Sequence, residues 1–260
     1  MDLKECIRNL SASTASLPRS APRFAALTLL FGLMLLATAP LSAQSAQLED
    51  VLAEGRGYFM AGIHSQDLSG LNGFLDRRDL PTFSESRTSI GGGGHVRMGP
   101  LHVGGEGHAL VRERTSTDDF ERTLTGGYGF FNLGYHFSPE ERVDLYPLIG
   151  IGGGANTFST VEVGAPSFGS VVQNPRRGAT LNQAALLLQA AVGTDYLVVL
   201  DELPGGRRGF MVGLRAGYTV PLWESDWDME EFRVTGGPGV GPQGFYLRVL
   251  IGGVGRVRDS

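Results

Sequence analysis

The segment GGGGHVRMGPLHVGGEGHALVR, residues 91–112, decides the fold. Polar and apolar residues alternate on both sides of MGPL, and alternation with a period of two is typical of β-strands. With the turn at Gly99 and Pro100, Met98 faces Leu101 and the polar faces of the two strands coincide, as a hairpin register requires. Each bulky polar residue further from the turn then meets a glycine. The predicted pairs are Arg97 with His102, His95 with Gly104, Gly93 with Glu106, and Gly91 with His108.

The same period-two alternation continues along most of the chain, with almost no helical periodicity. The connections alternate between long polar segments and short turns, as in membrane barrels with tight periplasmic turns and longer external loops. We therefore predict an all-β fold, an eight-stranded antiparallel up-and-down transmembrane barrel. Its strands lie near residues 56–65, 85–98, 101–114, 121–137, 142–157, 182–200, 208–222 and 244–257, and its outer loops near 66–84, 115–120, 158–181 and 223–243.

The first 43 residues have the layout of a secretory signal peptide. Four basic residues precede the apolar run FAALTLLFGLMLLATAPLSA, which ends in small residues. A single membrane anchor is the alternative, because the run is near the lower length limit for a spanning helix. With cleavage after Ala43, residues 44–55 form an N-terminal segment and residues 56–260 the barrel, and Cys6, the only cysteine, is removed. No later apolar run is long enough to span as a helix, so a mature chain in a membrane must be a barrel.

Strands with one apolar and one polar face suit either a soluble barrel or a membrane barrel, which differ in the face turned inward. Pairing of large residues with small ones favours the membrane barrel, because an eight-stranded lumen has room only for interlocking side chains. At FSPEER the predicted pairs are Gly134 with Tyr146, Phe130 with Gly150, and Tyr128 with Gly152. Aromatic residues gather near strand ends, as interfacial girdles would; they are Phe59, Tyr135, Phe137, Tyr196, Tyr218, Phe245, Trp223 and Trp227.

On these patterns, residues 56–257 resemble small eight-stranded outer-membrane β-barrels of the OmpA/OmpX type. The resemblance implies a location in the outer membrane after signal cleavage, with outer-membrane lipids and the barrel-insertion machinery as partners. Two features depart from the family. The chain ends in GRVRDS instead of an aromatic residue, and Pro147 lies inside the fifth predicted strand, although proline belongs at edges or bulges.

The polar faces predict a network of paired side chains that plugs the lumen, because buried charges usually persist as hydrogen-bonded sets. No metal or cofactor is predicted. His102 and His108 are about 20 Å apart along one strand and cannot share an ion, whereas His95, Glu106 and His102 are diagonal neighbours, so a metal site there is the alternative. The predicted network consists of Arg87, His95, Arg97, His102, Glu106, His108, Arg112, Asp144, Asp195, Arg215 and Arg248.

Four glycines of the hairpin, Gly92, Gly94, Gly105 and Gly107, fall on its apolar face. They predict a strip of nearly bare backbone, called here the glycine strip. A lipid chain or a neighbouring barrel is one interpretation. Strong bending of the strands, where glycine relieves crowding, is the other.

Several functions lack support in the sequence. The glycine clusters open no helix and no G-x-x-x-x-G-K-[ST] occurs, which argues against a phosphate loop, and no basic patch indicates nucleic acid. Some small outer-membrane barrels modify lipid A with a His/Ser pair. Here His64 and Ser65 face opposite sides of a strand, and His108 has no identified serine partner, so no enzyme is predicted.

The prediction for function is therefore a structural or surface-interaction role, with external loops that carry recognition. An extracellular partner would bind through loops 66–84, 158–181 and 223–243. The acidic segment 224–231 is either a solvated loop or a site for a cation or a basic partner. The alternatives from other classes are a lipid-modifying outer-membrane enzyme and a soluble periplasmic barrel that binds a small apolar ligand.

Overall fold

A computed structural model describes residues 51–140, 142–164, 167–173, 178–203, 206–230 and 232–258. The signal peptide predicted for residues 1–43 and most of the N-terminal segment lie outside the described residues.

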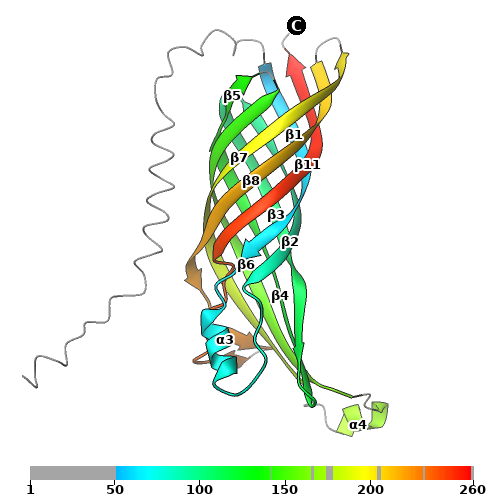
Figure 1. Ribbon diagram of the computed structural model, residues 1–260, viewed down its shortest axis with the longest axis vertical. Coiled ribbons are helices and arrows are strands. Elements are labelled where there is room, and N and C mark those ends of the chain that lie inside the picture. The colour runs from blue at the N-terminus through cyan, green and yellow to red at the C-terminus, as the bar shows by residue number, and fades with distance from the viewer. Residues whose placement is uncertain are drawn as a thin grey trace, which may run out of the picture. The chain divides into compact units, whose positions relative to one another are not determined.

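Eight strands form one closed antiparallel ring (Figure 1). They are β1 (Val51–Ser65), β2 (Ser86–Met98), β3 (Leu101–Ser116), β4 (Phe120–Tyr135), β6 (Val143–Glu162), β7 (Gly178–Leu203), β8 (Gly206–Glu224) and β11 (Gly244–Arg258). Each pairs with the next, and β1 pairs with β11 to close the ring. The predicted all-β, eight-stranded antiparallel fold is therefore confirmed.

Short elements connect the ring strands. Helix α3 (Ser69–Asp76) follows β1, β5 (Phe137–Glu140) continues beyond β4, α4 (Phe168–Gln173) joins β6 to β7, and β9 (Trp227–Met229) pairs with β10 (Phe232–Val234). Both ends of the predicted loop 158–181 are strand, because β6 and β7 pair out to Val161 and Gly178. Among the described residues, none of the helices has the length and apolarity needed to cross a membrane.

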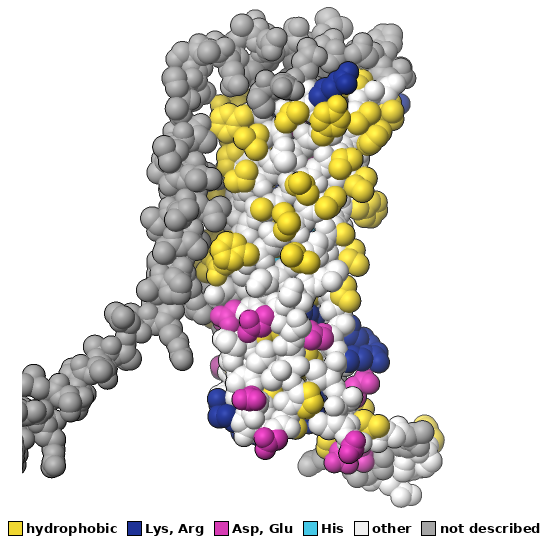
Figure 2. Space-filling model, in the orientation of Figure 1, with side chains coloured by type: hydrophobic (Ala, Val, Ile, Leu, Met, Phe, Trp, Pro, Cys, Tyr) yellow, Lys and Arg dark blue, Asp and Glu magenta, His cyan; other side chains and the backbone are white. Residues whose placement is uncertain are grey.

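The apolar faces of the strands point outward, and the polar faces point inward. Phe59, Ile251 and Leu214 are 81%, 59% and 50% exposed, whereas Glu106 and Arg215 are buried inside the ring. Figure 2 shows the apolar side chains as a broad belt and the charged ones gathered towards the end that carries α3 and α4. A soluble barrel needs the opposite arrangement, so the soluble periplasmic alternative is excluded.

Both ends of the described chain lie at one end of the ring. Val51 pairs with Arg258, beside the short β2–β3 and β7–β8 connections, while α3 and α4 lie at the other end (Figure 1). Outer-membrane barrels have short turns at the periplasmic end and long loops outside. We refer to these two ends as the periplasmic end and the outer end.

The register predicted at MGPL is confirmed pair by pair, from Met98 with Leu101 to Gly91 with His108. Gly99 has a φ of +60°, a left-handed conformation that glycine adopts without a steric penalty and that the tight turn requires.

The register predicted at FSPEER is wrong by two residues. The observed pairs are Gly134 with Leu148, Phe130 with Gly152 and Tyr128 with Gly154. The reason is β5, which continues the pairing with β6 until Glu140 faces Val143, so the turn lies later in the sequence than Pro139. A shift of two keeps each side chain on its predicted face, and Pro147 is accommodated within β6.

Segments from two of the long connections fold back over the outer end of the lumen. Leu68, Leu71, Leu75 and Phe83, on and around α3, form an apolar cluster with Leu124, Trp227 and Val240. Trp227 is thus buried and is not part of an interfacial girdle, whereas Trp223 is 58% exposed. The predicted loops 66–84 and 223–243 therefore close the outer end of the barrel.

Packing inside the ring predicts that a larger side chain at position 152 destabilises the barrel. A Cβ added there would collide with the carbonyl oxygen of Gly129 and approach the ring of Phe130. We expect Gly152→Val to lower the free energy of unfolding by roughly 1–3 kcal/mol, as overpacking does. Urea unfolding in detergent micelles, followed by heat-modifiable gel migration, measures this change.

Gly107→Val is the matched control, because Gly107 faces outward and an added Cβ there has no neighbour within 4 Å. The control should unfold as the wild type does. Equal losses of stability in both variants would contradict the packing argument.

Candidate functional site

A buried carboxylate holds two arginines together in the middle of the lumen. Glu106 of β3 accepts hydrogen bonds from Arg215 of β8 and, at 3.3 Å, from Arg248 of β11. All three side chains are fully buried. Gln189 of β7 also donates to Glu106, at 2.8 Å. These residues form what we call the central network, which joins opposite walls of the barrel.

Phenol groups complete the hydrogen bonding of the two arginines. Arg215 donates to the hydroxyl of Tyr146 at 3.1 Å, and Arg248 donates to that of Tyr128 at 2.9 Å. The guanidinium of Arg248 also lies 3.5 Å from the ring centroid of Tyr246. Hydrogen-bonded and stacked arginines of this kind are the form in which buried charges are tolerated.

A second group, the periplasmic network, lies nearer the periplasmic end. Arg56 of β1 pairs with Glu54, Asp144 and Asp195, the last at 2.7 Å. Arg97 lies 3.5 Å from both Glu54 and Asp144. The network thus contains three carboxylates, and at least two guanidinium groups pair with them.

The structure brings most of the predicted lumen residues together in these two networks. Arg97, Asp144 and Asp195 belong to the periplasmic network, and Glu106, Arg215 and Arg248 to the central one. His108 lies beside the central network, with its Nε2 3.5 Å from Glu106 Oε1.

Four predicted members lie elsewhere, and two of them, His95 and His102, are described below. Arg87 is buried near the outer end, where it donates to the carbonyl oxygens of Val111 and Leu124 at 2.8 and 3.1 Å. The prediction for Arg112 is wrong, because its side chain is exposed. A register irregularity between Leu110 and Glu113 interrupts the alternation that the prediction extrapolated.

The sequence reasoning missed Glu54, because the first strand was predicted to begin at residue 56, and it left Arg56, the first residue of that strand, out of the lumen network. Period-two spacing extends back from His64 through Tyr58 to both residues, and this signal identifies them as inward-facing.

The glycine strip lies on the outer face, as its register required. Gly92 pairs with Gly107 and Gly94 with Gly105. A Cβ on Gly94 would come within 2.9 Å of the Arg56 carbonyl oxygen, whereas one on Gly107 would meet nothing within 4 Å. A side chain at position 94 would therefore be crowded by the neighbouring strand β1, whereas the space over Gly107 is open. Binding of a lipid or a second barrel there stays a prediction.

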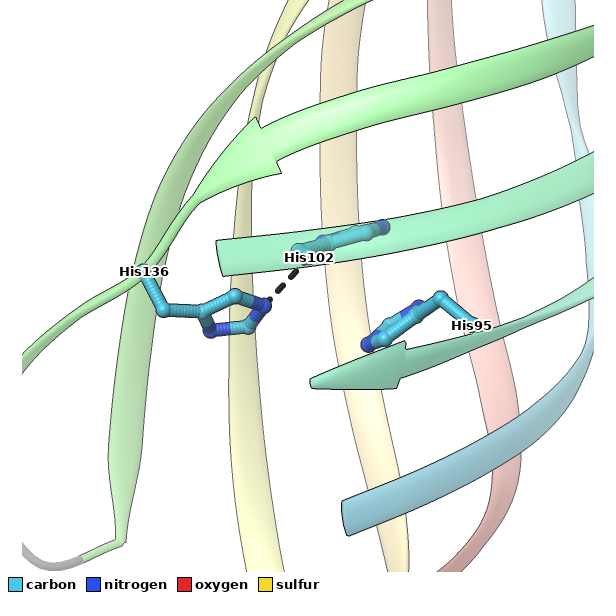
Figure 3. A group of neighbouring side chains, drawn as sticks. All are labelled: His95, His102 and His136. Atoms are coloured by element: carbon cyan, nitrogen blue, oxygen red, sulfur yellow. Dashed lines mark hydrogen bonds between the residues drawn. The ribbon is translucent and has the colours of Figure 1, made fainter. Parts of the chain in front are cut away.

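Three histidines meet at the periplasmic end of the lumen (Figure 3). His95 of β2 and His102 of β3 stack with ring centroids 3.7 Å apart. His136, just after β4, places its Nε2 3.1 Å from His102 Nδ1. One ring nitrogen from each residue lies within 4.8 Å of the other two. We call this group the histidine cluster.

Local structure explains how the histidine cluster forms. His95 lies opposite Gly104 and His102 opposite Gly134, so on one neighbouring strand no side chain competes with either ring; on the other, His95 pairs with Arg56 and His102 with Arg97. The backbone N–H of His136 donates to the carbonyl oxygen of Pro100 at 2.7 Å. That bond ties the end of β4 to the β2–β3 turn and holds His136 beneath the other two rings.

Most nitrogens of the histidine cluster have no protein partner. Within the described part of the chain, both ring nitrogens of His95, Nε2 of His102 and Nδ1 of His136 are buried without a hydrogen bond. Buried polar atoms nearly always have a hydrogen-bond partner, so four unpaired ring nitrogens in one cluster require an explanation. Burial lowers the pKa of His136, and a neutral imidazole keeps a lone pair for a ligand.

The sequence reasoning considered His95 and His102 together but linked them to Glu106, and predicted no metal. The predicted topology already placed His102 and His136 near the periplasmic end and pointing inward, and the observed register of β3 with β4 agrees with this, but His136 was not linked to a metal site. Its signal in the sequence was its position directly after β4, at the same end as the turn near His102.

The histidines weighed for catalysis face the lumen. His64 and His108 are buried, and both lie beside Tyr128, with ring centroids 5.4 and 5.1 Å from it. Ser65, adjacent to His64, is exposed on the opposite face.

The segments that close the outer end of the barrel are held by hydrogen bonds as well as by their apolar cluster. The carbonyl oxygen of Val240 accepts hydrogen bonds from Gln66 at 2.6 Å and Asn156 at 2.7 Å. Its backbone N–H donates to Gln183 at 2.9 Å. These bonds hold the segment before β11 inside the outer end of the ring.

A closed antiparallel ring with a charged, interlocked interior and an apolar outer belt defines an outer-membrane β-barrel protein. The apolar belt faces lipid, and the charged outer end extends beyond it (Figure 2). The predicted location in the outer membrane agrees with this architecture.

Comparison with known proteins gives structural neighbours only. No protein-family model and no curated protein sequence matches the chain. The chain is similar to Ail, the attachment invasion locus protein of Yersinia pestis, whose structure was solved in complex with the heparin analogue sucrose octasulfate. The sequence identity is 14% and the TM-score is 0.37, and the match covers 80% of this chain and 98% of Ail. Neisserial surface protein A matches with 15% identity and a TM-score of 0.32, covering 79% and 96%. The outer membrane protease OmpT from Escherichia coli matches with 8% identity and a TM-score of 0.29, covering 81% and 97%.

The central network predicts a severe effect of removing its only carboxylate. Glu106→Gln leaves Arg215 and Arg248 buried with no carboxylate to pair with. We expect a loss of roughly 3–5 kcal/mol in the free energy of unfolding, as for other broken buried ion pairs. Urea unfolding in micelles checks this value.

Glu121→Gln is the control, because it removes one half of the exposed pair between Arg114 and Glu121. Its effect should stay below about 1 kcal/mol. If Glu106→Gln were no more destabilising than this control, the central network would not be a main source of stability.

Proposed function

We propose that the protein is a non-conducting outer-membrane barrel with a structural or surface-interaction role, in which the outer end carries recognition. The observation that carries the proposal is the closure of the lumen at three levels: the periplasmic network, the central network and the apolar seal around α3. A barrel filled along its length offers its outer surface, not its interior, for function.

The filled interior supports the non-conducting role. Arg215, Arg248, Tyr146 and Leu187 are among the large side chains with almost no exposed surface. Conduction needs a continuous water path, and an eight-stranded ring leaves room only for interlocking side chains.

The charge of the outer end favours a basic partner. Asp118 and Asp119 at the β3–β4 connection are exposed, as are Asp226 and Asp228 before and in β9. Carboxylates gathered on one surface attract cationic groups and raise the rate of encounter with them.

A non-enzymatic role is part of the proposal. Lipid-modifying barrels would need their reactive groups on the membrane-facing surface, and burial of His64 and His108 in the lumen weighs against them. Their stacking beside Tyr128 fits a packing role.

Conductance tests the closed lumen directly. The protein reconstituted in a planar bilayer should show no steady ohmic conductance, because charged and aromatic side chains fill the ring. Porin from the same detergent serves as the positive control for insertion. A reproducible steady conductance would overturn the non-conducting role.

Binding of a basic polymer tests the outer end. Cells that display the barrel should adhere to a surface coated with polylysine, and adhesion should fall when salt is raised, since exposed charges are screened. The double variant Asp226→Asn and Asp228→Asn should weaken adhesion.

Arg233→Gln is the matched control on the same hairpin. It removes a cation that lies 3.8 Å from Asp226 and should strengthen adhesion. Adhesion that does not respond to any of these charge changes would contradict recognition of a basic partner.

A further inference from the structure

We propose that His95, His102 and His136 form a binding site for one divalent transition-metal ion of the zinc class, at the periplasmic end of the lumen. The site goes beyond the proposed surface role and uses residues at the other end of the barrel. The three residues come from β2, β3 and the position after β4, and their rings point toward one another (Figure 3).

Distances between the nitrogens are close to those of a metal site. In a tetrahedral zinc site with Zn–N bonds of about 2.0–2.1 Å, ligand nitrogens lie roughly 3.3 Å apart. Nδ1 of His102 and Nε2 of His136 are already 3.1 Å apart. The whole set lies within 4.8 Å, so rotation of the His95 ring out of its stack with His102 brings in the third nitrogen.

The unpaired nitrogens are a second, independent observation. Among the described residues, four ring nitrogens of the three histidines are buried with no hydrogen-bonding partner. Loss of a partner for a buried polar atom costs about 1–3 kcal/mol. An ion held by Nδ1 of His102 and Nε2 of His136 would give one of the two unpaired His95 nitrogens a partner, and no described tyrosine or backbone carbonyl bonds to either of them.

Surrounding charge permits a cation. Arg56 and Arg97 are nearby, but both pair with carboxylates of the periplasmic network, Glu54, Asp144 or Asp195. Arg215, the next cation along the lumen, is paired with Glu106. Each of these three arginines therefore already has a carboxylate partner.

The ligand type selects the class of metal. Three imidazoles suit zinc, copper and nickel, whereas calcium and magnesium prefer oxygen ligands. Three protein ligands leave a fourth position for water, as in open zinc sites.

The site lies close to the periplasmic space. His102 is the second residue of β3, His95 lies three residues before the end of β2, and His136 follows β4 at the same end. Stacking of Tyr146 on His136, with centroids 4.8 Å apart, supports the ring from the lumen side. An ion would therefore enter from the periplasmic end.

Metal titration tests the proposal. The protein, purified in detergent without a polyhistidine tag and treated with EDTA, is titrated with Co²⁺ as a spectroscopic substitute and then with Zn²⁺. We expect one Co²⁺ per chain, with the intense visible absorption of a four-coordinate ion, and its displacement by Zn²⁺.

Three single variants identify the ligands. His95→Gln, His102→Gln and His136→Gln should each weaken binding by more than about tenfold, since even changes outside the ligand shell cost roughly 10–100-fold. His108→Gln is the matched control, a buried lumen histidine outside the cluster, and should bind as the wild type does. Stoichiometric binding that survives all three substitutions, or equal loss in His108→Gln, would overturn the proposal.

Heat-modifiable gel migration establishes that each variant is folded. For any variant that fails to fold, X-ray absorption at the zinc edge of the wild-type protein gives the answer. Scattering from about three imidazoles supports the site. Absence of bound zinc, or coordination by oxygen alone, overturns it.

Discussion

An eight-stranded ring encloses a space only wide enough for side chains, so each inward-facing group must find its partner among the others. Glu106, Arg215 and Arg248 meet this constraint with one carboxylate shared by two arginines. Glycines meet this constraint because they have no side chain and so leave space for a large residue on the next strand, as Gly104 does for His95. The polarity of the lumen, the apolarity of the outer belt and the closure of both ends all follow from this limited space.

Charge is arranged in layers along the lumen. Three carboxylates, Glu54, Asp144 and Asp195, lie in the layer nearer the periplasmic end, whereas the central network has one carboxylate for two arginines. Phenol groups of Tyr146 and Tyr128 accept the remaining hydrogen bonds of those two arginines. Most carboxylates and the arginine-binding phenol groups are thus separated by depth. The long outer connections add an apolar layer above both.

Much of this arrangement could be predicted from the sequence wherever a turn fixes the register. MGPL leaves little freedom, and each pair derived from it is correct. FSPEER does not fix the turn length, and the strand register predicted there was wrong by two residues. Arg112 was misplaced because a bulge has no clear mark in the sequence. Topology also placed His136 near the periplasmic end and pointing inward, but the distances between the three histidine rings depend on side-chain packing and on the hydrogen bond to Pro100, which periodicity does not encode.

The ion pairs that Arg56 makes with residues distant in the sequence have a consequence for how the barrel closes. Arg56 belongs to the first strand, which forms the seam with the last strand, yet its partners Asp144 and Asp195 are 88 and 139 residues away, in the middle of the chain. Opening the seam would pull the Arg56 guanidinium away from these two buried carboxylates, while Glu54 stays with it on the same strand. The edges that could otherwise unzip locally are therefore tied to the far wall, and the ring closes and opens as a single cooperative unit.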